Sequence, residues 1–336
     1  MTKADVEGKT LTFDDYYAML KKMHDTKNSV VISAAGFIGT EAPYTNYLPE
    51  FYQQAHYTFY KDASGKYVDG FAEKAMEDAL SRLQMGVADG IIDKETVNNS
   101  TANARDKFYA DTTGVFSYWS GTWANTLKVN LENKKQDGSL IALNPIKELG
   151  SYIERASAPW CITTHASNPE GIFKYFIDKM LDGGDVQTAW VYGAKGTHWD
   201  TKAETVTLQG KEDKGTTWKE GEFHGLPSPE KPNTLMTKNH IDPLACLAEF
   251  TNGDPGKDII IPLAKSNNDW FVQHSTIEQT LPVTEELSDN ISDINKTRNV
   301  VINDVAVGKY TAAEGIQQYK AQVGDKVEKV LASLNK

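Results

Sequence analysis

The chain has 336 residues, of which 40% are hydrophobic and 24% charged, and its formal net charge is −11. This composition is typical of globular proteins and excludes wholesale disorder, and the length allows two domains of roughly 100–200 residues each. Lys and Arg are scattered without a basic block, so the sequence predicts neither a nucleic-acid partner nor a basic helix on a membrane surface.

The first half of the chain alternates predicted helices and strands. A helix is predicted over residues 12–24, because a Thr cap and an acidic first turn precede apolar residues at helical spacing. The elements expected after it are a buried strand (30–34), an aromatic helix (44–54), a hairpin (57–68), an amphipathic helix (71–86), an exposed link (90–104) and a short helix containing Phe108.

Residues 114–127 are the most informative stretch. Val115, Phe116, Tyr118 and Trp119 favour a strand, and the turn at Gly121 leads into a helix that begins with Trp123. Ligands of open α/β sheets bind beyond the carboxyl ends of strands, so this corner predicts an aromatic surface on which a sugar can stack. An aromatic core corner is the alternative interpretation of the same residues.

The second half begins with a predicted strand and ends in helices. Asn168 and Pro169 are typical of a helix start, and Thr311 with Glu314 forms a predicted capping box. The elements expected here are a strand (140–145), a helix (168–181), polar surface excursions (193–238) and helices over 275–280, 285–307 with breaks, and 311–334.

Catalytic and membrane signals are missing from the sequence. It contains no nucleophile elbow, phosphate loop or zinc-protease motif, its seven histidines stand singly, and no apolar run reaches the ~18 residues of a membrane span. The first residues lack an export signal. Cys161 and Cys246 have no metal-ligand spacing, which favours two buried thiols, with a disulfide as the alternative. We therefore expect no enzyme activity, cofactor or metal.

The order of these elements resembles the extracellular solute-binding proteins of family 1, the sugar receptors of bacterial ABC importers. No single motif is specific, but six follow the order of the family. They are the Thr-x-Asp-Asp helix (10–21), the aromatic turn Ala42-Pro-Tyr44, the helix with its Gly90-Ile-Ile-Asp93 tail (71–93), the G-x-W stretch (114–123), the strand with its Asn-Pro-Glu helix (158–182) and the closing Gly308 to Glu314 signature.

The resemblance implies an α/β fold of the type II periplasmic-binding-protein-like class. Residues 1–190 would form the second, C-terminal lobe, 191–285 a polar insert and a return segment to the first lobe, and 286–336 the C-terminal helices. In the family, an export signal and a first lobe precede the helix that starts here near residue 11. The resemblance therefore implies that most of the N-terminal lobe is missing from this chain.

The function implied is the capture of an oligosaccharide between two lobes and its delivery to ABC permease subunits outside the cell, with the full-length protein anchored at the surface as a lipoprotein. A carbohydrate-active enzyme or an accessory sugar-binding module is the alternative. No Lys or Arg lies within the aromatic stretches, which disfavours a charged ligand. The predicted ligand-binding residues are Trp123, Trp119, Tyr118, Tyr44, Asn46, Asn125 and Asp293.

Overall fold

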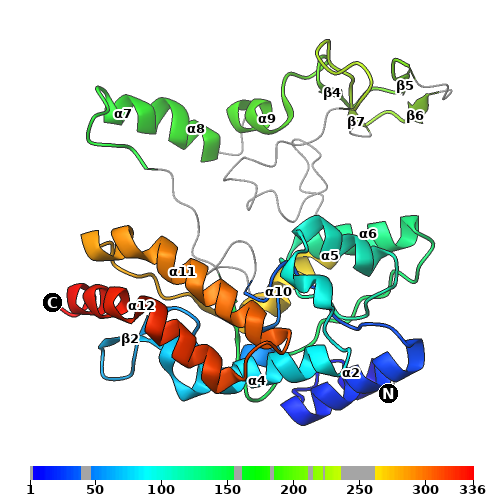
Figure 1. The fold of residues 1–336 in the computed structure, drawn as a ribbon. Helices are drawn as coiled ribbons and strands as arrows, with labels where there is room; N and C mark the ends of the chain where they lie inside the picture. Colours follow the sequence, from blue (N-terminus) through cyan, green and yellow to red (C-terminus); the bar gives the residue numbers. More distant parts are fainter. Residues whose placement is uncertain are drawn as a thin grey trace. The chain divides into compact units, whose positions relative to one another are not determined.

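The computed structural model describes residues 3–38, 47–154, 161–181, 185–210, 215–221, 224–235 and 262–336. The chain divides into two compact units (Figure 1): unit 1 comprises Met1–Ala156 and Asn267–Lys336, and unit 2 comprises Ser157–Ser266. These boundaries differ from the expected ones at residues 190 and 285. The assignment of the units to the lobes of a binding protein stays a prediction.

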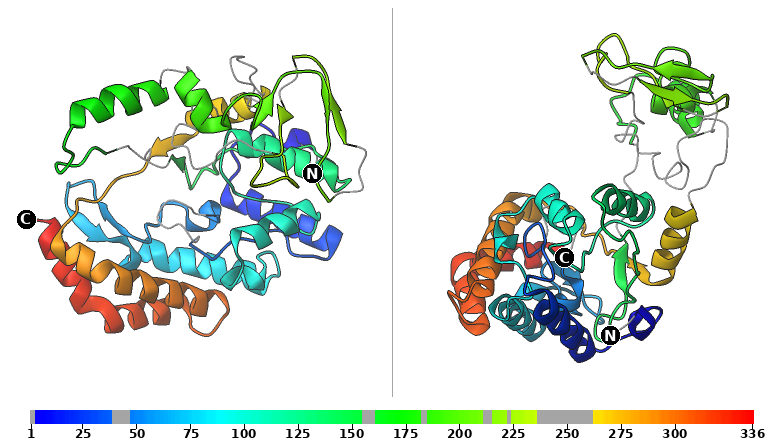
Figure 2. Two further views of the ribbon diagram at one scale, coloured as in Figure 1. Left: turned by 90° about the horizontal axis from the view of Figure 1, so that it is seen from above. Right: turned by 90° about the vertical axis from the view of Figure 1, so that its right-hand side faces the viewer.

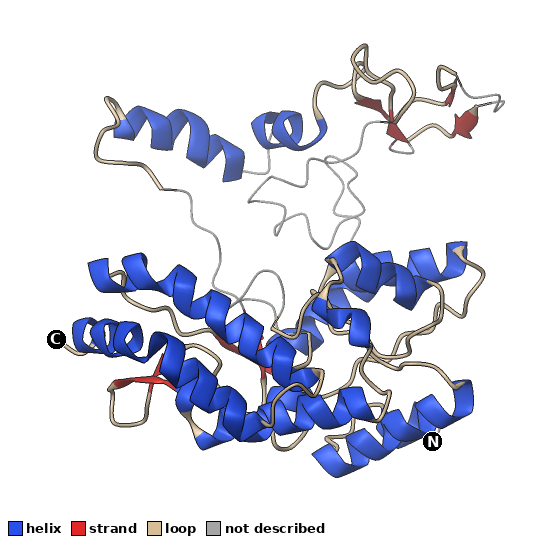
Figure 3. Cartoon of the chain, in the orientation of Figure 1, coloured by secondary structure: helices blue, strands red, loops and turns tan. Residues whose placement is uncertain are grey.

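Unit 1 consists mainly of helices, with short strands between them (Figure 3). Its α-helices are α1 (Lys3–Val6), α2 (Phe13–Lys27), α3 (Pro49–Tyr52), α4 (Lys74–Ala88), α5 (Thr101–Tyr109), α6 (Thr122–Asn133), α11 (Glu285–Ala306) and α12 (Ala312–Leu334). Its 3-10 helices are η1 (Gly70–Ala72) and η2 (Lys94–Val97), and its strands are β1 (Phe59–Lys61), β2 (Tyr67–Asp69), β3 (Tyr152–Glu154) and β8 (Ser275–Ile277). Helix α10 (Pro262–Gln273) crosses the boundary between the units.

Helices α2, α11 and α12 start where the sequence predicts, whereas α4 starts at Lys74, three residues later than predicted. Thr12 caps α2 by accepting a hydrogen bond from the Asp15 N–H, and Thr311 and Glu314 form the expected capping box of α12. α11 continues without the predicted breaks and packs beside α12 (Figures 1 and 2). Gly315 allows this close packing, because a Cβ atom there would lie 2.5 Å from Val305 Cγ2.

Three parallel segments form the centre of unit 1. The predicted strand around Ile32 is reduced to bridges with Ile92 on one side and Val115 on the other, both parallel. Ile91, Ile92 and Asp93 are buried, so the prediction of an exposed link over residues 90–104 is wrong for these three residues. Asp89, Gly90 and Asp93 beside the two isoleucines are typical of an exposed loop. The burial of Ile91 and Ile92 depends on parallel neighbours that are distant in sequence.

The remaining strands of unit 1 pair in two places. β1 and β2 form the predicted antiparallel hairpin, whereas β3 pairs in parallel with β8. The prediction of a helix over residues 275–280 is therefore wrong. Residues 140–145 form no strand, so that prediction is wrong as well. Pairing with β3 holds Ser275–Ile277 extended, and a contact between distant segments overrides the local pattern.

A buried ion pair joins α11 to the hairpin. The Arg298 guanidinium donates to Asp69 Oδ1 at 2.7 Å, and both side chains are at least 95% buried. The same guanidinium lies over the rings of Phe59, Phe71 and Tyr319, with its carbon 4.7–5.9 Å from their centroids. The pair thus fixes the C-terminal helices against the first half of the chain.

Unit 2 contains short elements. They are α7 (Pro169–Ile172), the π-helical turn η3 (Phe173–Ile177), α8 (Asp178–Leu181), α9 (Asp185–Tyr192), and the antiparallel pairs β4 (Trp199–Asp200) with β7 (His224–Gly225) and β5 (Glu204–Val206) with β6 (Thr216–Trp218). Cys161 is a free, exposed cysteine, which corrects the expectation of a buried thiol; Cys246 lies outside the described residues. Within the described ranges, no helix has the length and apolar character needed to span a membrane.

Candidate ligand-binding site

The carboxyl ends of the three parallel segments carry the side chains of interest. Ser33 follows the bridge residue Ile32, Asp93 follows Ile92, and an aromatic stretch follows Val115. Because the segments run in the same direction, the residues directly after the bridges emerge at one edge. This is the edge at which open α/β sheets bind ligands.

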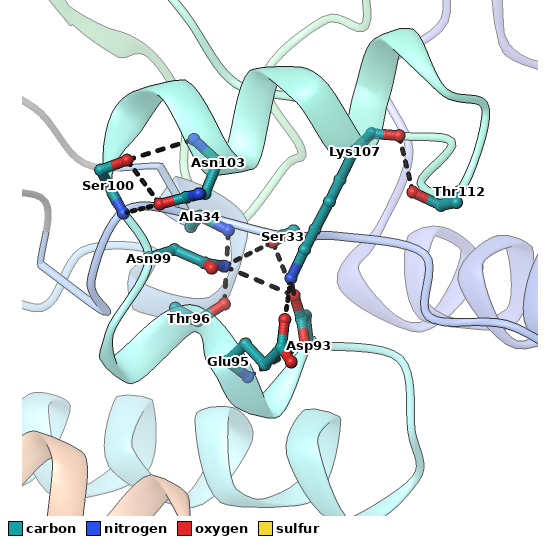
Figure 4. Close-up of polar contacts among 10 residues, drawn as sticks. All are labelled: Ser33, Ala34, Asp93, Glu95, Thr96, Asn99, Ser100, Asn103, Lys107 and Thr112. Carbon is teal, nitrogen blue, oxygen red and sulfur yellow. Dashed lines mark hydrogen bonds and ion pairs between the residues drawn. The ribbon is translucent and has the colours of Figure 1, made fainter.

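A buried polar network ties this edge to α5 (Figure 4). Ser33 Oγ donates to Asp93 Oδ2 at 2.8 Å, and Asn99 Nδ2 donates to Ser33 Oγ at 2.9 Å. Lys107, on α5, donates from Nζ to the same Asp93 oxygen at 2.6 Å and also contacts Glu95. These bonds fix α5 over the strand ends.

The charges of this network stabilise one another. Burial by itself would raise the pKa of Asp93, but hydrogen bonds from Lys107, the Glu95 N–H and Ser33 lower it below its usual value. Burial likewise would lower the pKa of Lys107, but the two carboxylates raise it. Asp93 is therefore an anion and Lys107 a cation in the folded protein at neutral pH.

Four aromatic side chains form a continuous row beside this network. Phe108 stacks on Phe116 with 5.3 Å between ring centroids, Phe116 on Tyr118 at 5.1 Å, and Trp123 meets Tyr118 edge-on at 4.9 Å. Tyr47 adds a stacked ring 6.4 Å from Tyr118. Tyr118 and Trp123 are only partly buried, so part of each side chain is accessible to a ligand.

Arg105 brings a positive charge to the aromatic row. Its guanidinium carbon lies 5.1 Å from the Trp123 centroid and 5.7 Å from the Tyr118 centroid, and its Nη1 lies 3.3 Å from the Tyr118 hydroxyl, to which it donates. The side chain is half-buried. The tertiary structure therefore places a cation beside the predicted aromatic residues, although no Lys or Arg lies within residues 114–127.

Gly121 shapes the start of α6 as the sequence predicts. Its φ of 71° with ψ of −128° is a conformation that residues with a Cβ rarely adopt. Its N–H donates to Asn267 Oδ1 of α10 at 2.9 Å. The corner that carries Trp123 is thus held by a residue far away in sequence.

The structure brings some of the predicted site residues together. Tyr118 and Trp123 are in contact, Trp119 is half-buried next to Tyr118 in the chain, and Asn125 is half-buried on α6. Tyr44 and Asn46 lie outside the described residues.

Asp293 is placed elsewhere in unit 1. It is exposed on α11, pairs with Lys326 of α12, and lines a groove between these two helices. The first half of α11 lies on the side of unit 1 away from α6 (Figure 1). The structure therefore does not bring Asp293 to the aromatic row.

Sequence reasoning missed the contribution of α5. Arg105 and Phe108 are three residues apart and share one face of the helix, whereas Lys107 points to the polar network. The spacing of Arg105 and Phe108 was visible in the sequence. Their partners, Phe116 and Tyr118, could be identified only from the packing of α5 on the third parallel segment.

No protein-family model matches the chain, and no curated protein sequence does so either. Solved structures do resemble it. The alginate-binding protein AlgQ2 has a TM-score of 0.56 and 17% sequence identity, over 97% of this chain and 68% of that one. The N-glycan transport solute-binding protein NgtS from Streptococcus pneumoniae has a TM-score of 0.53 and 15% identity, again over 97% and 68%.

At these identities the resemblance establishes the fold. The chain has a periplasmic-binding-protein-like α/β fold, as predicted from the order of its elements. Both neighbours are binding proteins by description and neither is described as an enzyme. Membership of family 1 and a preceding first lobe stay predictions.

Proposed function

We propose that this chain is an oligosaccharide-binding component of an ABC importer, acting outside the cell and delivering its ligand to permease subunits. The observation that carries the proposal is the row of aromatic rings, ending in Tyr118 and Trp123, at the carboxyl ends of parallel segments. The neighbours support it, because one is described as alginate-binding and the other as an N-glycan transport protein.

A sugar ring offers a protein two different surfaces. A pyranose has an apolar C–H face and a rim of hydroxyl groups, so an indole ring takes the face and polar side chains take the rim. Tyr and Trp have only two side-chain torsions to immobilise, which limits the entropic cost of binding. In this proposal Trp123 and Tyr118 stack on sugar rings, with Trp119, Asn125, Tyr44 and Asn46 as further candidate contacts.

The test is calorimetric titration of the protein with a panel of neutral and acidic oligosaccharides. Trp123→Ala should weaken binding by about 1–3 kcal/mol, by analogy with bases stacked on aromatic side chains. Trp123→Phe should retain most of the affinity, because it keeps a ring. Tyr310→Ala, between α11 and α12, is the matched control and should bind like the wild type.

The core interpretation and the enzyme alternative predict different results. If Trp123 were purely a core residue, Trp123→Ala would lower the unfolding free energy by roughly 3–5 kcal/mol and leave sugar affinity unchanged. Release of reducing sugar from the same oligosaccharides would instead favour a carbohydrate-active enzyme. Either result would refute the proposed role.

A further inference from the structure

Arg105 is unusual among the described arginines because it is not matched by an acidic or carbonyl partner. Arg298 is paired with Asp69, and Arg82 donates to the backbone carbonyls of Phe51 and Tyr52. Within the described part of the chain, Arg105 makes one hydrogen bond, to the Tyr118 hydroxyl, and no ion pair. A guanidinium has five N–H donors, so most of its donor capacity is available.

The contrast with Lys107 on the same helix is direct. Lys107 contacts the carboxylates of Asp93 and Glu95, so its charge is compensated within the fold. Arg105 instead lies over the rings of Trp123 and Tyr118, which attract a cation but do not neutralise it. In a protein with a net charge of −11, this leaves a positive charge beside the aromatic row.

Aromatic rings and a guanidinium together match one class of ligand. The rings accept the apolar face of a sugar, and the planar fork of arginine fits a carboxylate through two parallel hydrogen bonds. Packing against Trp123 and Tyr118 restricts the orientation of the fork, so less conformational entropy is lost when a carboxylate binds.

We propose that the site binds an acidic oligosaccharide, with Arg105 pairing with the carboxylate of a uronic-acid residue whose ring stacks on Trp123 or Tyr118. This inference rests on the proposed function and names the class of ligand for the same site. It replaces the expectation of an uncharged ligand, which followed from the absence of Lys and Arg within the aromatic stretches of the sequence.

The test uses the full chain and matched pairs of ligands. Tetrasaccharides of galacturonate, mannuronate and glucuronate are each titrated beside the same tetrasaccharide with its carboxylates reduced to neutral hydroxymethyl groups. At least one acid should bind roughly tenfold or more tightly than its reduced form, as expected for hydrogen bonds to a charged group. Its affinity should also fall as the salt concentration rises.

Variants then assign the preference to Arg105. Arg105→Gln should weaken binding of the acidic ligand roughly ten- to hundredfold and change binding of the reduced ligand less than about twofold. Arg105→Lys keeps the charge but loses the fork and should lie in between. Lys74→Gln removes a positive charge from an exposed site on α4 and is the control, which should bind as the wild type does.

The outcomes separate this inference from the proposed function. If the reduced ligands bind as tightly as the acids, or if Arg105→Gln leaves the preference intact, the acidic ligand is refuted and the sugar-binding role stands. Binding of a sulfated sugar without binding of any uronate would also refute it. If no oligosaccharide binds, both proposals fall. If Arg105→Gln does not fold, the test is the wild-type protein alone. An acidic ligand that binds no tighter than its reduced form, or whose affinity does not fall with salt, refutes the proposal.

Discussion

Removing the Lys107 ammonium should both destabilise the protein and weaken ligand binding. Lys107→Met keeps the aliphatic stem of the side chain on α5 and deletes the partner of Asp93. Asp93 would then be a buried carboxylate that keeps its hydrogen bonds from Ser33 and the Glu95 N–H but loses its counter-charge. Because α5 also carries Arg105 and Phe108, loosening this helix should disturb the aromatic row.

The size of the effect follows from burial. The side chains of Asp93 and Lys107 are 9% and 26% exposed, and their charged atoms are 2.6 Å apart. Deleting one partner of a fully buried pair costs about 3–5 kcal/mol, so the remaining donors and the partial exposure reduce the expected loss to about 2–4 kcal/mol. Glu95 is 73% exposed, so Glu95→Gln should cost no more than about 1 kcal/mol.

The assay is urea unfolding followed by circular dichroism, at neutral pH and at about pH 3. The folded pKa of Asp93 lies below its usual value, so the stability that this carboxylate contributes is present above the unfolded pKa of about 3.9 and is lost as the pH falls through the folded pKa. The cost of Lys107→Met should therefore shrink in acid. An equal, small cost for Lys107→Met and Glu95→Gln would contradict the assigned role of the buried pair.

Two further predictions concern buried charges elsewhere in unit 1. Arg298→Met should lower the unfolding free energy in urea by about 3–5 kcal/mol, because the buried Asp69 loses its partner. Adding Asp69→Asn should recover part of this loss. A cost of Arg298→Met below about 1 kcal/mol would contradict the assigned role of the pair. Burial raises the pKa of Glu50, although its own backbone hydrogen bond and the Tyr152 hydroxyl oppose this shift. The folded state therefore prefers protonated Glu50, and the protein loses stability as the pH rises from the unfolded pKa of about 4.3 through the raised folded pKa. In thermal unfolding, the stability of Glu50→Gln relative to the wild type should therefore increase as the pH is raised from acidic to alkaline. A difference that does not change with pH would refute this assignment.

The sequence by itself determined the local features of the fold. The caps at Thr12 and Thr311, the hairpin of β1 and β2 and the helix start after Gly121 depend on residues within a few positions of one another, so their patterns are legible without a structure. The order of these elements indicated the fold class, and the density of aromatic residues over 114–123 indicated Tyr118 and Trp123.

Only the tertiary structure decided how distant segments meet. Ile92 is buried because Ile32 lies beside it, and Ser275–Ile277 is extended because β3 pairs with it. Arg105 lies over Tyr118 and Trp123 because α5 packs on the segment after Val115. In each of these contacts the two residues are too far apart in sequence to be linked by the periodicity of one helix or one strand. Burial and charge at such positions depend on which partner the folded chain supplies, and hydrophobic periodicity in the sequence does not specify that partner.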